Sequence, residues 1–204
     1  MLKKILGVKI DDISKNQALD LVSSWLSQKK GLGPKSKIIV TLGPEFLVTA
    51  QKNDGFKKIL NSADLSLPDG FGLHLAGVKN RVTGIDFMLK LCEVSGENNW
   101  TVGLLGGWQG AAHETASELI KRYPNINIAI KIDGHQADRV LTSLKIPPVD
   151  LLFVAFGHPR QEKLLFDLKG QFRVGMGVGG AFDYISGQVP MAPAFFKFLG
   201  LEWC

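Results

Sequence analysis

The sequence predicts an α/β fold with a mainly parallel sheet that is covered by helices on both faces. Short apolar runs alternate with longer segments whose apolar residues have helical spacing, which is typical of parallel strands joined by helices. Runs such as Ile38-Ile39-Val40 are apolar throughout, as expected for strands that are buried on both faces. The chain also has 23 glycines, and many of them follow these runs, where the backbone must turn sharply.

The expected elements follow in order along the chain. Ser14 and Gln17 have the spacing of a capping box, so a helix is expected to start after Ser14. Pro44 suits the first turn of the helix after the second strand. Residues 96–99 are expected to form a loop. Strands are expected at residues 4–10, 36–42, 65–67, 100–105, 126–132, 151–156 and 174–178, and further helices at residues 56–60, 85–94, 111–123, 137–144 and from the 157–162 turn to residue 168.

The composition limits the class of partner. A chain of 204 residues, of which 45% are hydrophobic and 21% charged, suits one globular domain. The formal net charge of +5 favours an anionic partner, such as a phosphorylated substrate or an acidic membrane surface. A mildly basic protein without such a partner would have the same charge. No segment interleaves basic and aromatic residues, so no nucleic-acid partner is expected.

The cysteines and the apolar runs indicate the compartment. Cys92 and Cys204 have neither the spacing of metal ligands nor that of a disulfide framework, which favours a reducing cytosol. The apolar run at the start of the chain is too short for a signal peptide. No run approaches the ~20 residues needed to span a bilayer. Any membrane association is therefore expected to be peripheral.

The stretch Leu67-Pro68-Asp69-Gly70-Phe71-Gly72 is the first candidate for chemistry. Pro68 fixes one backbone angle, and the two glycines permit conformations that other residues resist. Such a turn can direct the Asp69 carboxylate into a cleft, where it would act as a general base. The stretch also fits a surface turn whose aspartate caps the next helix. The local motif favours the surface turn, and both interpretations stay open at this point.

Other polar residues also follow strands of the predicted sheet. Because the carboxyl ends of parallel strands meet at one edge of the sheet, we expect these residues to form one site. Arg81, in the stretch Arg81-Val82-Thr83-Gly84, lies close in sequence to Asp69. The polar residues expected at strand ends are Thr41, Asp69, His135, Gln161 and Asp183.

Two glycine turns are candidates for binding a phosphate. Gly106-Gly107 precedes a predicted helix, so backbone N–H groups could face an anion there. The spacing does not complete a dinucleotide-binding fingerprint, and a plain tight turn explains it equally well. Gly179-Gly180 follows the last predicted strand in the same way.

Several catalytic motifs are missing from the sequence. The four histidines are scattered without a His-x-x-x-His pair, and no Asp-x-Asp pair is available to hold a divalent metal on a nucleotide diphosphate. A Gly-x-Ser-x-Gly elbow and a Walker loop are also missing. No metal site is therefore expected, and hydrolase and kinase functions are disfavoured.

Four ordered motifs together resemble the bacterial WecG/TagA/CpsF glycosyltransferases. The resemblance runs from about Lys4 to Trp203, and four motifs in order are far more specific than any one of them. Ala192-Pro193 and the closing Gly200-Leu201-Glu202-Trp203 also match. The four motifs are Leu67-Pro68-Asp69-Gly70-Phe71-Gly72, Arg81-Val82-Thr83-Gly84, Phe156-Gly157-His158-Pro159-Arg160-Gln161-Glu162-Lys163 and Gly177-Val178-Gly179-Gly180-Ala181-Phe182-Asp183.

The resemblance implies a Rossmann-like enzyme that works on the inner face of the cytoplasmic membrane as a peripheral protein. Members of the family transfer N-acetylmannosamine, or a related sugar, from a UDP-sugar to a polyprenyl-diphosphate-linked N-acetylglucosamine. The anomeric configuration inverts, and the products enter teichoic acid or other cell-surface polysaccharide synthesis. The family is thought to need no metal or other cofactor. The sequence leaves the oligomeric state open, a homo-oligomer included.

The resemblance also implies roles for individual residues. It makes Asp69 the base that takes the acceptor proton, with Arg81 and the amides of glycine turns supporting the departing UDP. It places Gln161 at the donor sugar or diphosphate. His135 matches a position where the family often has a tyrosine against the uracil, and Asp183 would also lie near the uracil.

The sequence departs from the family pattern in three places. Gly43 replaces a common asparagine, and Met191 stands where the family often has arginine. Residues 1–190 are expected to form the glycosyltransferase domain. Residues 191–204 are expected to begin a basic C-terminal appendage that is truncated or absent. We therefore expect weak or absent transfer with a retained UDP site.

Two other functions remain open from the sequence. One is a catalytically weak nucleotide-sugar binding protein of the same fold, which Gly43 favours. The other is a nicotinamide-dependent oxidoreductase, which only the glycine turns support.

Overall fold

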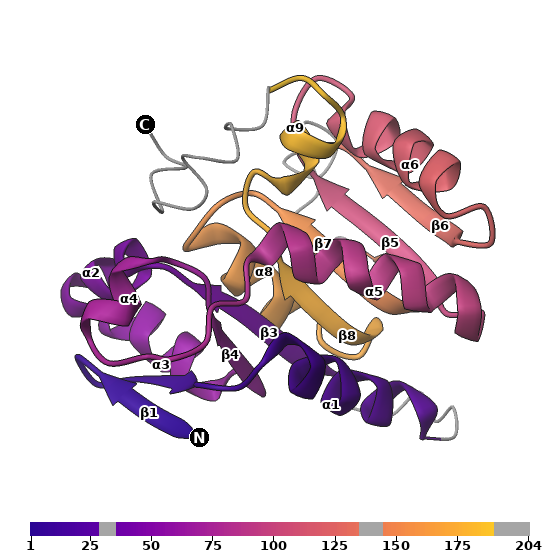
Figure 1. Ribbon diagram of the computed structural model, residues 1–204. Helices are drawn as coiled ribbons and strands as arrows, with labels where there is room; N and C mark the ends of the chain where they lie inside the picture. The colour runs from indigo at the N-terminus through magenta and orange to yellow at the C-terminus, as the bar shows by residue number, and fades with distance from the viewer. Residues whose placement is uncertain (29–35, 135–144, 190–204) are drawn as a thin grey trace.

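The computed structural model describes residues 1–28, 36–134 and 145–189. Its centre is a six-stranded sheet in which every neighbouring pair of strands is parallel (Figure 1). The predicted α/β class is thereby confirmed. The strand order is β4-β3-β8-β7-β5-β6. The bounds are β3 Lys37–Leu42, β4 Leu65–Pro68, β5 Thr101–Gly106, β6 Asn127–Ile132, β7 Val149–Ala155 and β8 Phe172–Gly177.

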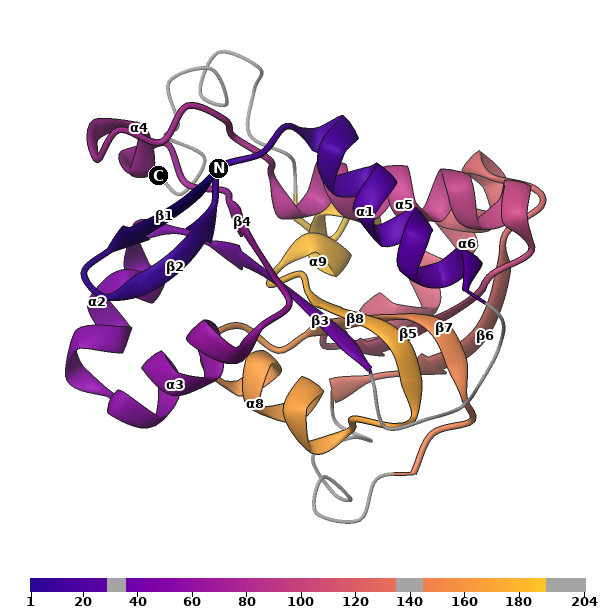
Figure 2. The same cartoon turned by 90° about the horizontal axis from the view of Figure 1, so that it is seen from below.

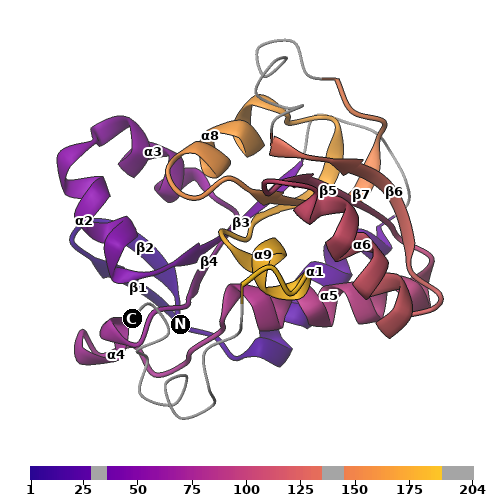
Figure 3. The same cartoon turned by 90° about the horizontal axis from the view of Figure 1, so that it is seen from above.

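Helices cover the sheet on both sides. Figures 2 and 3 show α1, α5, α6 and α9 on one face and α3 and α8 on the other. A short helix, α4, lies beyond the end of β4. The bounds are α1 Lys15–Ser27, α2 Pro44–Lys52, α3 Asp54–Ser62, α4 Gly72–Leu75, α5 Gly84–Asn98, α6 Ala111–Arg122, α8 Arg160–Asp167 and α9 Ala181–Ile185.

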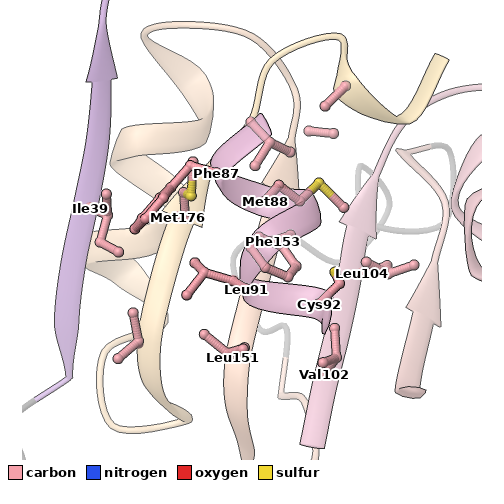
Figure 4. Close-up of a cluster of buried hydrophobic side chains, with 14 of the residues drawn as sticks. Ile39, Phe87, Met88, Leu91, Cys92, Val102, Leu104, Leu151, Phe153 and Met176 are labelled. Carbon is pink, nitrogen blue, oxygen red and sulfur yellow. The ribbon is translucent and has the colours of Figure 1, made fainter. Parts of the chain in front are cut away.

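Successive residues of the central strands enter two separate cores, because side chains of a strand alternate between its faces. In β3, Ile39 packs in the core beneath α1 and α5, whereas Ile38 and Val40 pack beneath α2, α3 and α8. On the first face, α5 lies across the sheet, and its buried Phe87, Leu91 and other apolar side chains meet β5, β7 and β8 (Figure 4). The apolar runs of the sequence are therefore strands that are buried on both faces.

The first predicted strand is in fact a hairpin. Strands β1 (Leu2–Ile5) and β2 (Val8–Asp11) pair antiparallel. Leu6 and Gly7 join them with φ values of 48° and 79°. Two successive positive φ values are the backbone of a tight hairpin turn. Asp11 then accepts a hydrogen bond from the Ser66 N–H (2.8 Å), so the hairpin lies beside β4.

Two helical boundaries also differ from expectation. Helix α5 continues through residues 96–98, which were expected as a loop. Gly96 fits there because a Cβ would lie 3.3 Å from the backbone of Asn125 and Ile126. The helix after β3 is interrupted at Asn53, whose side chain accepts the Phe56 N–H and caps α3. The expected helix at 137–144 and the expected appendage at 191–204 lie outside the described residues.

The order of the strands creates a crevice between β3 and β8. These two strands are neighbours, yet the chain leaves β3 towards α2 on one face and leaves β8 towards α9 on the other. A crevice outside the carboxyl ends of two such strands is where open α/β sheets bind ligands.

Candidate active site

A cavity of about 690 Å³ lies at this crevice. The ends of β3, β4 and β8 and the starts of α2, α5 and α8 supply its walls. Both polar and apolar side chains face it. The lining residues are Thr41, Gly43–Phe46, Asp69–Gly72, Arg81, Thr83–Ile85, Gly157, His158, Gln161, Val178–Ala181 and Tyr184.

The turn that carries Asp69 is fixed by the backbone of β3. The N–H groups of Asp69 and Gly70 both donate to the Leu42 carbonyl, at 3.0 and 3.4 Å. Neither Gly70 nor Gly72 is among the glycines with a positive φ, so the conformational reason given from the sequence is wrong. A side chain at Gly70 would overlap Pro44, and a Cβ at Gly72 would lie 2.8 Å from Pro44 Cγ. The glycines let this turn pack against the start of α2.

The Asp69 carboxylate both binds a helix start and faces the cavity. Its Oδ2 accepts a hydrogen bond of 2.8 Å from the Gly84 N–H, the first residue of α5. A helix N-terminus stabilises a negative charge, so the start of α5 suits a carboxylate at this position. Thr41 lies alongside and donates to the Gly177 carbonyl at 3.4 Å. The two interpretations of Asp69 from the sequence are thus compatible, although the helix it meets is α5 rather than the next one, α4.

Arg81 lies against the same turn. Its Nε donates to the Asp69 carbonyl oxygen at 2.8 Å, and the Val82 N–H donates to the Pro68 carbonyl at 2.7 Å. The loop that carries Arg81 therefore runs directly along the Asp69 turn. A cation and a carboxylate consequently line one cavity from adjacent backbone segments.

A buried carboxylate fixes the loop immediately before Arg81. Asp12 accepts hydrogen bonds from the N–H groups of Lys79 (3.1 Å) and Asn80 (2.9 Å) and pairs with Lys3 at 2.9 Å. Burial acts to raise the pKa of Asp12, but these bonds outweigh it and hold the pKa well below its usual range. The ionised Asp12 thus connects the N-terminal hairpin to the Arg81 loop.

Gln161 connects α8 to the glycine turn after β8. It is 2% exposed, and its Oε1 accepts the Gly179 N–H at 2.9 Å. Its Nε2 donates to Glu162 Oε1 at 2.8 Å. Gly179 has a φ of +53°, a conformation that glycine adopts easily. The Gln161 amide therefore helps to hold the Gly179-Gly180 turn in the cavity wall.

Glu162 lies in the third family motif, and the sequence alone indicates no role for it. It is fully buried, and burial raises its pKa to about 7, although the Gln161 hydrogen bond acts in the opposite direction. Its Oε2 has no hydrogen-bond partner among the described residues. A signal was present in the sequence, because Glu162 precedes the apolar Leu165 and Phe166 by three and four residues, which is the spacing of one helical face. A charged residue in that register is expected to be buried.

Some predicted site residues lie away from the cavity. Gly106 and Gly107 do not line it, and the Gly107 N–H donates to the Ala155 carbonyl at 2.7 Å. A side chain at Gly106 would overlap that same carbonyl, so this segment has the geometry of a tight turn against β7. Asp183 lies in α9 outside the lining, and burial raises its pKa. His135 lies outside the described residues.

Other lining residues were not singled out from the sequence. His158 stacks on Phe46 with a ring-centroid distance of 4.6 Å, and its Nε2 lies 3.3 Å from Thr49 Oγ1. The Glu45 carboxylate folds over Gly43 so closely that a Cβ there would overlap it. The space of the expected asparagine side chain is therefore filled in part by Glu45. No local pattern distinguished these residues, because each also suits a helix start or a core.

Within residues 1–28, 36–134 and 145–189, no group of three or more His, Cys, Asp or Glu side chains is arranged to hold a metal ion. Among the helices in those ranges, none has the length and apolar character needed to cross a bilayer.

The fold and the site define an α/β protein that binds its ligand at the carboxyl end of a parallel sheet. An open parallel sheet carries a cavity at its switch point, and a carboxylate and an arginine face it, as in α/β proteins that bind their ligands there. Residues 3–204 match the model of the Glycosyl transferase WecG/TagA/CpsF family. The chain belongs to this glycosyltransferase family.

Curated relatives agree with that assignment. The chain is 32% identical over 193 residues to an N-acetylglucosaminyldiphosphoundecaprenol N-acetyl-beta-D-mannosaminyltransferase of Bacillus subtilis (strain 168), covering 90% of this chain and 73% of the relative. It is 28% identical over 210 residues to a protein of the same name from Staphylococcus aureus (strain NCTC 8325 / PS 47), covering 98% and 81%.

Proposed function

We propose that the protein transfers N-acetylmannosamine, or a related sugar, from a UDP-sugar to a polyprenyl-diphosphate-linked N-acetylglucosamine, with inversion. The names of the two relatives support the sugar and the acceptor. The observation that carries the chemistry is the placement of Asp69 and Arg81 in one cavity. The product would enter cell-surface polysaccharide or teichoic acid synthesis.

Inversion requires a single displacement at the anomeric carbon. The acceptor hydroxyl oxygen forms the new bond to that carbon while the bond to the UDP oxygen breaks, and the electron pair leaves with UDP. Asp69 takes the hydroxyl proton, which suits a carboxylate that is held at a cavity wall. Arg81 and nearby backbone N–H groups stabilise the charge that develops on the departing diphosphate.

We assign this charge to Arg81 rather than to a bound metal. Arg81 lines the cavity and is fixed against the Asp69 turn, and a guanidinium pairs well with phosphate oxygens. Transfer is then expected to persist after dialysis against EDTA. An absolute requirement for added Mg²⁺ or Mn²⁺ would contradict this part of the proposal.

The surface beside the cavity suits contact with the cytoplasmic membrane face. Phe71 lines the cavity and is 44% exposed, and Leu75 on α4 is 87% exposed. The exposed Lys79 follows in the same loop, and Lys3 donates to the Gly77 carbonyl. Apolar side chains with nearby cations fit an anionic bilayer surface. A lipid-linked acceptor would then meet Asp69 without leaving the membrane.

This contact can be tested with vesicles. Leu75→Glu is expected to lower the fraction bound to phosphatidylglycerol vesicles roughly tenfold, since burying a leucine contributes about 1.5–3 kcal/mol. Ile120→Glu is the matched control, because Ile120 is also exposed (46%) but lies on α6. Equal loss of binding in both variants, or in neither, would reject α4 as the membrane contact.

The base is tested by Asp69→Asn. Transfer is expected to fall by about 10²-fold or more, because the amide cannot take the proton, while UDP affinity by titration calorimetry is retained. Asp20→Asn, an exposed carboxyl on α1, is the matched control. Near-normal turnover by a folded Asp69→Asn protein would exclude Asp69 as the base.

The alternative function is a catalytically weak nucleotide-sugar binding protein of the same fold. Its support is Gly43, which removes one polar side chain from the cavity wall. A UDP titration and a transfer assay on one preparation separate the two functions. Binding of UDP without detectable transfer would favour this alternative.

A further inference from the structure

Glu162 and Gln161 form a buried pair between α8 and β8. Gly177 makes room for both, because a Cβ there would lie 2.9 Å from Glu162 Oε1 and 2.7 Å from Gln161 Nε2. Gln161 reaches the cavity, but Glu162 does not line it. Any effect of Glu162 on a ligand in the cavity must therefore pass through a neighbouring group.

Burying the Glu162 side chain lowers the stability of the fold, because a carboxylate loses its hydration there. Glu162 is 0% exposed, and its Oε2 has no partner in the described part of the chain. In the same register of α8, Leu165 is buried and Phe166 packs against the core. An apolar residue of similar size would pack there without the desolvation of a carboxylate. Packing alone does not explain a glutamate at this site.

The contact with Gln161 provides an explanation. A glutamine amide has an acceptor end and a donor end, and its orientation is set by the groups that it meets. The Gly179 N–H needs an acceptor, which is Gln161 Oε1, and the Glu162 carboxylate needs a donor, which is Gln161 Nε2. The two contacts therefore fix the same orientation. One Nε2 hydrogen remains beyond the bond to Glu162, on a residue that lines the cavity.

We propose that Glu162 is a positioning residue, which holds the Gln161 amide so that the Gly179-Gly180 turn and the donor hydrogen of Gln161 keep one geometry at the cavity wall. The effect on the substrate rests on the proposed function, with the UDP-sugar as the ligand that Gln161 and this turn meet. The effect on the turn itself does not depend on that function.

Two variants separate hydrogen bonding from packing. Glu162→Gln keeps an oxygen that can accept from Gln161 Nε2, whereas Glu162→Met keeps similar volume without that acceptor. The matched control is Glu118→Met on α6, where the glutamate side chain is 44% exposed and pairs only with Lys121 among the described residues. Thermal unfolding and circular dichroism establish that each variant is folded.

The first measurement needs no substrate. Hydrogen exchange of the Gly179 N–H, followed by NMR, is expected to accelerate about fivefold to tenfold in Glu162→Met, the equivalent of one net hydrogen bond. Glu162→Gln and Glu118→Met should exchange as the wild type does. Unchanged exchange in Glu162→Met would overturn the proposal.

The second measurement is steady-state kinetics, which compares the KM for the UDP-sugar with the KM for the acceptor. The KM for the UDP-sugar is expected to rise about fivefold in Glu162→Met while the KM for the acceptor stays constant, and Glu162→Gln should restore the wild-type value. Equal KM values for the UDP-sugar in Glu162→Met and the wild type would show that Glu162 does not position the substrate. If the wild type neither binds UDP nor transfers sugar, the proposed function fails, and Gly179 exchange still decides the role of Glu162.

Discussion

Two buried carboxylates lie behind the cavity wall without lining it, and their surroundings are opposite. Asp12 accepts from two backbone N–H groups and pairs with Lys3, so its pKa is lowered. Glu162 accepts from Gln161 but leaves one oxygen without a partner among the described residues, so burial raises its pKa. We therefore expect the first carboxylate to stabilise the fold in its ionised form and the second to reduce the stability of the fold.

The difference shows two ways of supporting one site. Asp12 fixes the loop before Arg81 from the hairpin side, and its removal would leave several donors without an acceptor. Glu162 supports Gln161 from α8 beneath β8, and its replacement is expected to raise stability. Residues that lower stability beside a cavity are commonly retained for function. The following variants test whether this contrast is correct.

The largest expected effect is that of Asp12→Ala. It should lower the free energy of unfolding by about 3 kcal/mol, because breaking a buried ion pair leaves donors unpaired. Urea unfolding at pH 7 measures the loss. Asp12→Asn keeps one acceptor oxygen and should lose less. The deficit of Asp12→Asn should shrink as the pH falls below the ordinary aspartate value of 3.8, because the unfolded wild-type chain then takes up a proton at Asp12 while the folded chain does not. Equal stability of Asp12→Ala and the wild type would remove the contrast.

A smaller effect of opposite sign is expected for Glu162→Gln, which should raise the free energy of unfolding by about 1–2 kcal/mol at pH 8. Below pH 4.5 the carboxyl is protonated in the folded and the unfolded chain alike, and the gain should vanish. Between pH 4.5 and about 7 the unfolded chain releases the proton first, so the wild type loses stability as the pH rises.

Urea unfolding of the wild type and Glu162→Gln at pH 5, 6, 7 and 8 measures this gain. A difference that stays constant with pH would show that the charge of Glu162 is not its cause. A Glu162→Gln protein that is less stable at pH 8 would place Glu162 in the same class as Asp12.

The smallest effect is expected for Lys3→Met. The Lys3 side chain is 23% exposed, and a partly solvated ion pair contributes up to about 1 kcal/mol. Asp12 keeps its backbone partners in this variant. Urea unfolding in low and high salt measures the loss, which should be smaller than that of Asp12→Ala. A larger loss would mean that the charge pair, rather than the backbone contacts, fixes the loop.

The strands were predicted well because their signal is local. A run such as Ile38-Ile39-Val40 is apolar on both faces wherever it lies in the sheet. The N-terminal hairpin was missed because Leu6 and Gly7 interrupt an apolar pattern only briefly, and the positive φ of Leu6 is unusual for a leucine. The order of the strands is not local and could not be derived from such patterns.

The strand order also decided which predicted residues reach the cavity. Thr41 lies near the end of β3, and Gly179 follows β8, which is the neighbour of β3. Gly106 ends β5, and β8 and β7 separate β5 from β3. A glycine turn at a strand end is therefore not sufficient evidence of a site. The roles of Asp69, Arg81, Gln161, Gly179 and the other candidates stay predictions.

The hairpin beside β4 has a consequence for solubility. Strand β4 is at one edge of the sheet, and an open edge offers unpaired N–H groups to a strand of another molecule. The Asp11 carboxylate occupies the Ser66 N–H at that edge, and it presents a negative charge to any approaching backbone. A neutral residue at position 11 would favour aggregation through β4.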